Sequence, residues 1–232
     1  TAAMTSMTYT APAETGSVTL SLSISQTSDG DSPNANLFYN SGNGNYYELV
    51  DNGSAITWAA AETAAAEKSL LGATGYLATI TSEAENTFIA EKTTAEDIWI
   101  GASDDVAVVN AAIADADPGA EGAWYWVTGP VAERKQFSTG STVIEGEYAA
   151  WASGEPNNSG SGENFAVTNW SSSSGEWNDL AGDNSGVDRY LVEYTGADTS
   201  ADSDTATATI SLTGPTVSAV SPAAGSEDGG TF

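Results

Sequence analysis

Between residues 151 and 179 the chain concentrates acidic and amide side chains that can hold a cation. Three carboxylates and two side-chain amides stand out: Glu155, Asn157, Glu163, Asn178 and Asp179. Calcium takes about 6–8 oxygen ligands from carboxylates, amide carbonyls and backbone carbonyls. These side chains supply such oxygens and leave coordination positions for two neighbouring hydroxyl groups of a ligand. Each hydroxyl would also donate to a carboxylate and accept from an Asn NH₂ group.

The residue types that are missing narrow the metal chemistry. The 232 residues include no cysteine and no histidine. Disulfides, thiol nucleophiles and thiolate or imidazole zinc sites are therefore excluded. Any metal must sit among oxygens, which favours calcium over zinc or iron.

Charge excludes two classes of partner. The chain has 32 acidic and five basic residues, a formal net charge of −27. Nucleic acids and anionic lipids both require clustered Lys and Arg. No apolar run approaches the ~20 residues of a membrane helix. We expect no nucleic-acid partner and no direct membrane insertion. The acidic residues either keep a secreted protein soluble or converge on divalent cations, and both can hold.

The two ends of the chain differ from its middle. Residues 17–24 and 205–212 alternate polar and apolar side chains, which predicts two half-exposed strands. Two lone strands cannot bury a core, so we infer a split all-β, immunoglobulin-like domain that flanks or receives a central insertion. Residues 215–232 resemble the start of a further immunoglobulin-like repeat, or are a disordered end. The predicted segments are 1–35, 36–196, 197–214 and 215–232.

The middle of the chain predicts a mixture of helices and strands. Ser82 with Glu85 three residues later forms a capping box that starts a helix running through Phe88 and Ile89. From about residue 103 to 188 regular periodicity is absent, and long loops of this kind are usually functional or held by a ligand. The other expected elements are a helix at 57–71 and strands at 76–80, 98–102 and 189–194.

Four ordered segments carry a family resemblance. They are WIGA at 99–102, GAWYWVTG at 122–129, WASGEPNN at 151–158 and EWND at 176–179. In this order, after two helices, they resemble the C-type lectin domain across roughly residues 36–195. In its sugar-binding members, Glu-Pro-Asn is followed six positions after the Asn by a second Glu, and later by Trp-Asn-Asp. Asn157 is followed at the sixth position by Glu163, and residues 177–179 are Trp-Asn-Asp.

The resemblance implies a fold and a ligand. The fold is α+β and C-type lectin-like, with two helices, small antiparallel sheets and a long calcium-binding loop region. The bond before Pro156 is implied to be cis. Glu-Pro-Asn implies mannose, glucose, N-acetylglucosamine or fucose type ligands. The implied Ca²⁺ ligands are Glu155, Asn157, Glu163, Asn178 and Asp179, of which the sugar contacts Glu155, Asn157, Glu163 and Asn178.

The chain departs from the family in two respects. The usual disulfides are absent: Ala65 and Val192 fall where one pair would sit, and Phe165 where another would begin. We expect apolar packing to replace these crosslinks. An auxiliary calcium ion is not expected, because positions 158 and 164, commonly acidic in the family, are both Asn.

Other aromatic and acidic residues have structural explanations. Trp177 is expected to place the two residues that follow it, and Trp170 either packs or lines the site. The residues expected in the core are Trp99, Trp124, Trp126 and Trp151. A solvated loop is expected for Asp104, Asp105, Asp115 and Asp117. Solvated turns or a second metal site are the alternatives for Asp29, Asp31, Asp198, Asp202 and Asp204.

These observations favour a calcium-dependent carbohydrate-binding module of a bacterial surface adhesin. It would belong to a longer, multi-domain extracellular chain and bind cell-surface glycan. The alternative is calcium-dependent binding of a protein or peptide, since the lectin-like fold serves that role too. A glycosidase with Glu155 and Glu163 as its pair is not expected, because acids around calcium are pushed toward the ionised form. A spacer without a ligand is the remaining alternative.

Overall fold

The computed structural model describes residues 36–197, apart from 115, 117, 120, 161 and 172–174. Three predicted features lie outside these residues: the strands at 17–24 and 205–212 and the tail at 215–232. The acidic residues of the possible second metal site, Asp29, Asp31, Asp198, Asp202 and Asp204, also lie outside them. The flanking immunoglobulin-like domain and the domain boundaries stay predictions.

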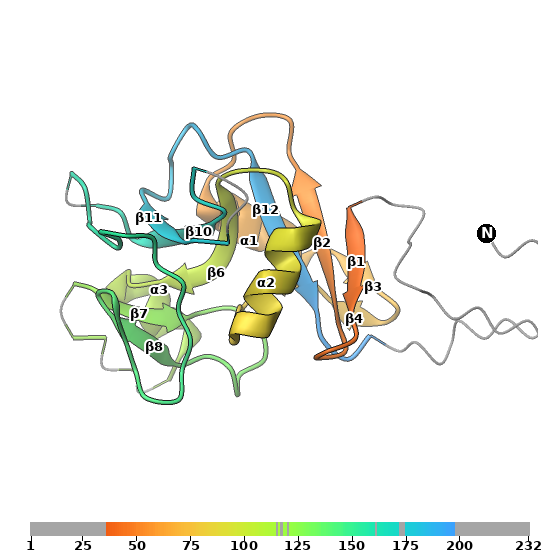
Figure 1. Ribbon diagram of the computed structural model, residues 1–232, viewed down its shortest axis with the longest axis horizontal. Helices are drawn as coiled ribbons and strands as arrows, with labels where there is room; N and C mark the ends of the chain where they lie inside the picture. The colour runs from red at the N-terminus through yellow and green to blue at the C-terminus, as the bar shows by residue number, and fades with distance from the viewer. Residues whose placement is uncertain are drawn as a thin grey trace, which may run out of the picture. The chain divides into compact units, whose positions relative to one another are not determined.

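The described residues form three helices and a branched sheet (Figure 1). The helices are α1 (Trp58–Ala66), α2 (Glu83–Lys92) and α3 (Val106–Ala112). The first strands are β1 (Leu37–Asn40), β2 (Asn45–Asp51), β3 (Ser69–Leu70), β4 (Ala73–Thr74), β5 (Tyr76–Leu77) and β6 (Ile98–Ser103). They are followed by β7 (Ala123–Trp126), β8 (Gln136–Thr139), β9 (Thr142–Val143), β10 (Phe165–Thr168), β11 (Asn178–Leu180) and β12 (Arg189–Tyr194).

One sheet connects most of these strands. Its order is β1-β2-β12-β6-β7-β8-β9, with β10 between β6 and β11 and with β5 against β12. The pairing of β12 with β6 is parallel, and the other pairings are antiparallel. None of the described helices is long and apolar enough to cross a membrane.

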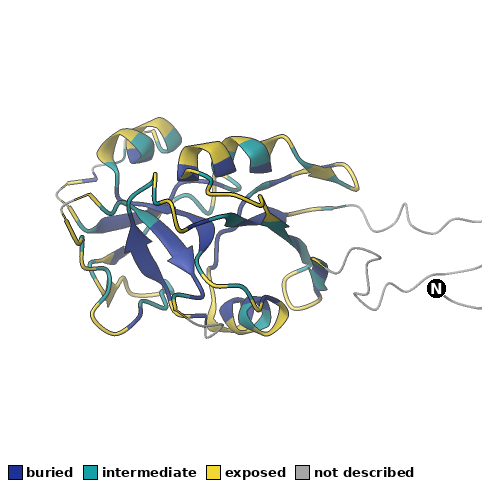
Figure 2. Ribbon diagram, turned by 90° about the horizontal axis from the view of Figure 1, so that it is seen from above, coloured by how far each residue is buried: buried dark blue, intermediate teal, exposed yellow. Residues whose placement is uncertain are grey.

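Strand β6 is buried along its whole length because helices cover both faces of the sheet (Figure 2). Side chains alternate between the faces of a strand. Trp99 accordingly packs in one core cluster with Trp58 of α1, and Ile98 and Ile100 pack in another with Ile89 of α2. A run of apolar residues without alternation is what a strand covered on both faces requires.

Helix α1 begins where the sequence predicts and ends earlier. The Thr57 side chain accepts a hydrogen bond from Ala60 N at 3.2 Å, and Trp58 Nε1 donates to Ile100 O at 2.8 Å. The predicted end at 71 is wrong, because the helix stops at Ala66. Residues 69–74 form the β3–β4 hairpin instead, with its turn at Leu71 and Gly72, whose φ angles are 47° and 83°. The helix itself ends earlier, at a C-cap residue, Glu67, that keeps right-handed backbone angles.

Helix α2 begins at the predicted cap. Ser82 Oγ accepts from Glu85 N at 3.3 Å, as a capping box requires. The Glu85 side chain does not complete that box. It accepts from Thr81 N at 2.8 Å and from Tyr47 Oη at 2.5 Å, and so joins the helix to β2. Predicted strands at 98–102 and 189–194 are confirmed as β6 and β12, whereas only Tyr76–Leu77 of the strand at 76–80 is extended in the sheet.

The stretch from 103 to 188 is more regular than expected. It contains α3 and five short strands, and the prediction of a solvated loop at Asp104 and Asp105 is wrong. Asp105 Oδ1 accepts from Ala107 N and Val108 N, which caps α3, and Asp104 is buried. Asp115 and Asp117 lie outside the described residues. The strands were missed because two to four residues carry too little periodicity without their partners.

The tryptophans form the structural core that the sequence predicts. Trp99, Trp124 and Trp126 are buried, and Trp151 is half-buried with its ring centroid 4.8 Å from that of Trp124. Trp177 is fully buried and donates from Nε1 to Asn86 Oδ1 at 3.0 Å. Trp124, Trp126, Trp151 and Trp177 contact one another through their rings, whereas Trp99 packs in the other core cluster.

Apolar packing occupies the positions where the family would have disulfides. Ala65 and Val192 are both fully buried in the same cluster. Gly75 fits between them, since a Cβ atom there would lie 2.7 Å from both Ala65 O and Val192 Cγ1. Phe165 packs against Trp58 with ring centroids 4.8 Å apart. The packing predicted as a replacement for crosslinks is therefore present.

Beneath α2, a buried acidic network joins the helix to β2 and β12. Glu193 is 1% exposed, and its carboxylate accepts from Asn45 Nδ2 at 2.6 Å and from Thr79 N at 3.0 Å. Tyr47 Oη lies 3.3 Å from the same carboxylate. Burial, followed by the charge of Glu85, raises the pKa of Glu193 to about 8, and the charge of Glu133 adds to this. Burial and the neighbouring negative charges therefore favour the protonated form of Glu193 in the folded protein.

Glu193 makes folding stability dependent on pH. Its pKa lies above the unfolded value, so between about pH 4.5 and pH 8 unfolding releases a proton and stability falls as the pH rises. We expect the urea midpoint to drop by roughly 0.5 M or more from pH 5 to pH 8. Glu193→Gln should flatten this slope, and the exposed control Glu91→Gln should not. Equal slopes in all three proteins would contradict the assignment.

Surface charge generates a second prediction. With a net charge of −27 and five basic residues, like-charge repulsion opposes the compact state. Raising NaCl from 0.05 to 1 M shortens the Debye length from over ~10 Å to ~3 Å. The Tm should rise by about 5 °C or more, as followed by circular dichroism in EDTA. A Tm that is flat or falls with salt would show that repulsion does not limit stability.

Candidate metal centre

The segment from Ala150 to Asn158 is attached to the residues around β11. Trp177 N donates to Ala150 O at 2.8 Å, and Ala152 N donates to Trp177 O at 2.9 Å. These two bonds form an isolated parallel bridge between Trp151 and Trp177. Two parts of the chain that each carry expected ligands are thereby held next to each other.

The side chain of Asp179 also binds the segment from Ala150 to Asn158. It is 1% exposed, and β11 pairs it with Ala166 of β10. Asp179 Oδ1 accepts from Asn157 N at 3.0 Å, and Oδ2 accepts from Asn158 N at 2.8 Å. A carboxylate on a paired strand thus fixes the backbone of the Glu-Pro-Asn segment.

Glu155 and Asn157 lie on either side of Pro156 and contact each other. The peptide bond between Glu155 and Pro156 is cis, as the resemblance implies. Asn157 Nδ2 donates to Glu155 Oε2. Glu155 is half-buried and Asn157 is exposed, so both side chains remain accessible to a ligand.

Glu163 is held by the far end of the same loop. Its backbone N–H donates to Asn158 Oδ1 at 3.1 Å, and its Oε2 accepts from Ser159 N at 2.8 Å. Asn158 therefore connects two expected ligands: its backbone N–H donates to Asp179, and its side chain accepts from Glu163 N.

Asn178 has a buried acceptor without a partner. The residue is 3% exposed, and its Oδ1 atom makes no hydrogen bond. The large majority of buried side-chain polar atoms in folded proteins have a partner, and each exception asks for an explanation such as an ion. An unpaired oxygen next to Asp179 fits a cation ligand better than a hydrogen-bond acceptor for the protein itself.

The electrostatics of this group also fit a cation. Burial raises the pKa of Glu155, and the nearby charges of Asp179 and Glu163 raise it further. Burial likewise raises the pKa of Glu163, with Asp179 adding to it and the Ser159 N–H opposing it. The basic residues interact with other partners: Lys68, Lys92, Arg134, Lys135 and Arg189. Carboxylates that repel one another without a cationic side chain suit a divalent ion.

The acidic side chains of this loop region do not form a metal site by themselves. Among the described residues, no three acidic side chains converge closely enough to hold a metal by themselves. A calcium site here would also need the amide oxygens of Asn157 and Asn178, which mixed carboxylate and carbonyl coordination allows. The structure brings Glu155, Asn157, Glu163 and Asp179 close together, and Asn178 precedes Asp179 on β11. Their oxygen atoms are of the types that calcium takes.

Asp104 is a neighbour of this set that the sequence did not single out as functional. Burial raises its pKa to about 7, with the charges of Glu121 and Asp179 adding to it, although Gly122 N donates to Asp104 Oδ2 at 2.9 Å. Its backbone N–H contacts Asn164 O at 3.3 Å. In the sequence, the feature that could have marked Asp104 as functional is its position directly after the apolar strand β6.

Trp170 packs in the interior. It is half-buried against the core cluster that contains Trp99, and its backbone N–H donates to Glu176 O at 3.0 Å. Of the two interpretations left open for this residue, the structure supports packing.

Several solved structures are similar to this chain. The cow CD23 carbohydrate-recognition domain, solved in the presence of a GlcNAc2Man3 oligosaccharide, is 24% identical with a TM-score of 0.45, covering 71% of this chain and 95% of that one. The C-type lectin CEL-I from Cucumaria echinata is 20% identical with a TM-score of 0.46, covering 71% and 98%. Human lithostathine is 18% identical with a TM-score of 0.45, covering 74% and 96%.

A curated relative is closer in sequence. Halomucin from Haloquadratum walsbyi is 40% identical over 180 residues, which are 76% of this chain. This chain spans only about 2% of the length of halomucin.

The family model described as Lectin C-type domain matches residues 54–187, which is more than half of the chain. The predicted α+β C-type lectin-like fold is confirmed, with α3 as a helix that was not expected. The chain therefore belongs to the C-type lectin domain family.

Proposed function

We propose that this domain is a calcium-dependent carbohydrate-binding module that recognises vicinal hydroxyls of mannose, glucose, N-acetylglucosamine or fucose type glycans. The observation that carries the proposal is the unpaired, buried Oδ1 of Asn178 beside mutually repelling carboxylates. A cation would satisfy both features at once. The sugar preference rests on the Glu155-Pro156-Asn157 segment and on family resemblance.

The roles of the side chains follow from their hydrogen-bonding capacity. When bound, calcium would supply coordination positions to two sugar hydroxyls and stabilise the ionised carboxylates. Glu155 and Glu163 accept the hydroxyl protons, since a carboxylate can only accept. Asn157 and Asn178 donate from Nδ2 to the remaining hydroxyl lone pairs. The contact of Asn157 Nδ2 with Glu155 would open to admit the sugar.

Binding without catalysis fits these electrostatics. A glycosidase needs one carboxyl group with a raised pKa as its general acid. The pKa of Glu155 is raised by burial and by like charges. A bound cation would oppose the charge contribution and favour the ionised form.

We infer that the domain belongs to a long extracellular surface protein of adhesin type. The support is the 40% identity to a stretch of halomucin that makes up about 2% of that protein. The net charge of −27 fits a solvated surface module. A cell-surface glycan is the proposed partner, and a peptide is the alternative.

Calcium and Glu155 are the subject of the first test of this proposal. Removing the carboxylate removes an oxygen ligand and a hydroxyl acceptor, so Glu155→Ala should reduce binding on a glycan array by at least about 100-fold. EDTA should have the same effect on the unmodified protein. The exposed control Glu145→Ala should bind normally. Binding that survives EDTA or Glu155→Ala would refute the proposal.

Competition separates a sugar from a peptide. Free mannose, fucose or N-acetylglucosamine at about 50 mM should displace a bound glycan or natural ligand, since a site with a Kd of a few millimolar for the free sugar is filled at that concentration. A calcium-dependent ligand that none of these sugars displaces would favour the peptide alternative.

A further prediction concerns Asn158, which positions Glu163. Asn158→Ala removes the acceptor of the Glu163 N–H, and loss of such supporting contacts weakens metal binding by about 10–100-fold. Isothermal titration with CaCl₂ measures this change. Asn184→Ala is a matched control, because Asn184 Oδ1 accepts a similar backbone bond from Gly186 N at 2.8 Å in another turn. Equal calcium affinity in both variants would remove Asn158 from the site.

A further inference from the structure

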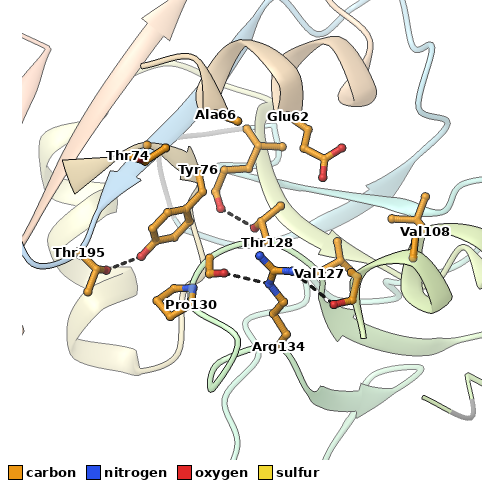
Figure 3. A pocket seen from close by; sticks show the side chains of 15 residues that line it. Glu62, Ala66, Thr74, Tyr76, Val108, Val127, Thr128, Pro130, Arg134 and Thr195 are labelled. Carbon is orange, nitrogen blue, oxygen red and sulfur yellow. Dashed lines mark hydrogen bonds between the residues drawn. The ribbon is translucent and has the colours of Figure 1, made fainter. Parts of the chain in front are cut away.

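A cavity of about 660 Å³ lies between α1, α3, β5 and the loop that follows β7 (Figure 3). It shares no residue with the candidate metal centre. Its volume falls in the range of about 300–1,000 Å³ that is typical of small-molecule sites. Most of its wall is apolar, formed by residues such as Ala66, Val108, Ala112, Val127 and Pro130.

Arg134 enters this cavity from the loop after β7. Its Nε donates to Gly129 O at 2.9 Å, and its Nη1 donates to Ala112 O at 3.3 Å. A guanidinium has five N–H donors, so these two bonds fix its orientation and leave three for a ligand. Figure 3 shows the guanidinium at the cavity with dashed lines to these two carbonyl oxygens.

Glu62 enters the cavity from α1 on the opposite wall (Figure 3). The side chain is half-buried, and burial raises its pKa while the charge of Arg134 lowers it. The pKa of Glu62 therefore depends on the charge of Arg134. Yet among the ion pairs of the described residues, none joins Glu62 to Arg134 within 4.0 Å. Glu62 and Arg134 thus line the same cavity with opposite charges and do not form an ion pair with each other.

We propose that this cavity binds a small zwitterion of the size of an amino acid or a dipeptide. The ligand ammonium contacts Glu62, the ligand carboxylate contacts Arg134, and its side chains lie against the apolar wall. The site goes beyond the proposed carbohydrate binding and does not require calcium.

The charges of the protein favour this ligand class over others. A net charge of −27 repels a simple anion, and a simple cation would leave Arg134 without a counter-charge in a partly desolvated site. A neutral sugar usually stacks on an accessible aromatic ring. The one aromatic residue lining the cavity is Tyr76, and its hydroxyl is already bonded to Thr195.

The test uses alanyl-alanine as the probe, titrated into the whole chain in EDTA and followed by isothermal calorimetry and amide NMR shifts. Saturable binding with a Kd below about 10 mM is expected, with shifts around Glu62 and Arg134. N-acetyl-alanyl-alanine lacks the ammonium and alanyl-alaninamide lacks the carboxylate. Each should bind at least about tenfold more weakly.

Glu62→Gln is the decisive variant, because it removes the charge and keeps the shape. It should weaken alanyl-alanine binding about tenfold and abolish the preference for the free ammonium over the acetylated form. Glu67→Gln, an exposed acid just after the same helix, should change neither. Circular dichroism checks that both variants fold, and Arg134→Lys tests the carboxylate contact separately.

Three results would overturn the proposal. These are no saturable binding up to about 50 mM, equal binding of the blocked and free dipeptides, and binding that Glu62→Gln leaves unchanged. N-acetylglucosamine that binds here with Glu62 sensitivity while alanyl-alanine does not would show a sugar site instead.

Discussion

The carboxylate of Asp179 is the constraint on which the loop region depends. It lies on a strand that β10 holds in register, and it accepts the backbone N–H groups of both Asn157 and Asn158. The bridge at Trp177 adds two backbone bonds to the same segment. The loop at residues 150–158 is thus held in place by hydrogen bonds to residues 177 and 179. The proposed ligands on both sides of Pro156 are positioned by a residue that is itself a proposed ligand.

The domain reaches this arrangement without a disulfide. Its sheet is covered by helices on both faces, so β6 is buried throughout, and Ala65, Gly75 and Val192 pack where the family would have a crosslink. Polar networks complement this packing. Glu85 and Glu193 join α2 to the sheet through Tyr47, and protonation relieves their repulsion. At the candidate metal centre similar repulsion among Glu155, Glu163 and Asp179 would instead be relieved by a cation.

The main elements could be predicted because their signals are local. The Ser82 cap and the apolar stretch at 98–102 each specify an element within about ten residues. The missed elements were those whose formation depends on partners. Strands of two to four residues such as β5 and β11 exist because β12 and β10 pair with them. The end of α1 was misplaced because residues 69–74 form a hairpin whose turn has left-handed backbone angles.

The sequence by itself determined the available chemistry. Without cysteine or histidine, a metal must be held by oxygen, and the spacing of Glu155, Asn157 and Glu163 predicts the segment that would supply it. Only the tertiary structure decided which polar groups lack partners and which charges meet. The unpaired Oδ1 of Asn178 and the facing charges of Glu62 and Arg134 depend on side chains from distant segments. Burial and long-range electrostatics arise from three-dimensional packing, and no local pattern encodes them.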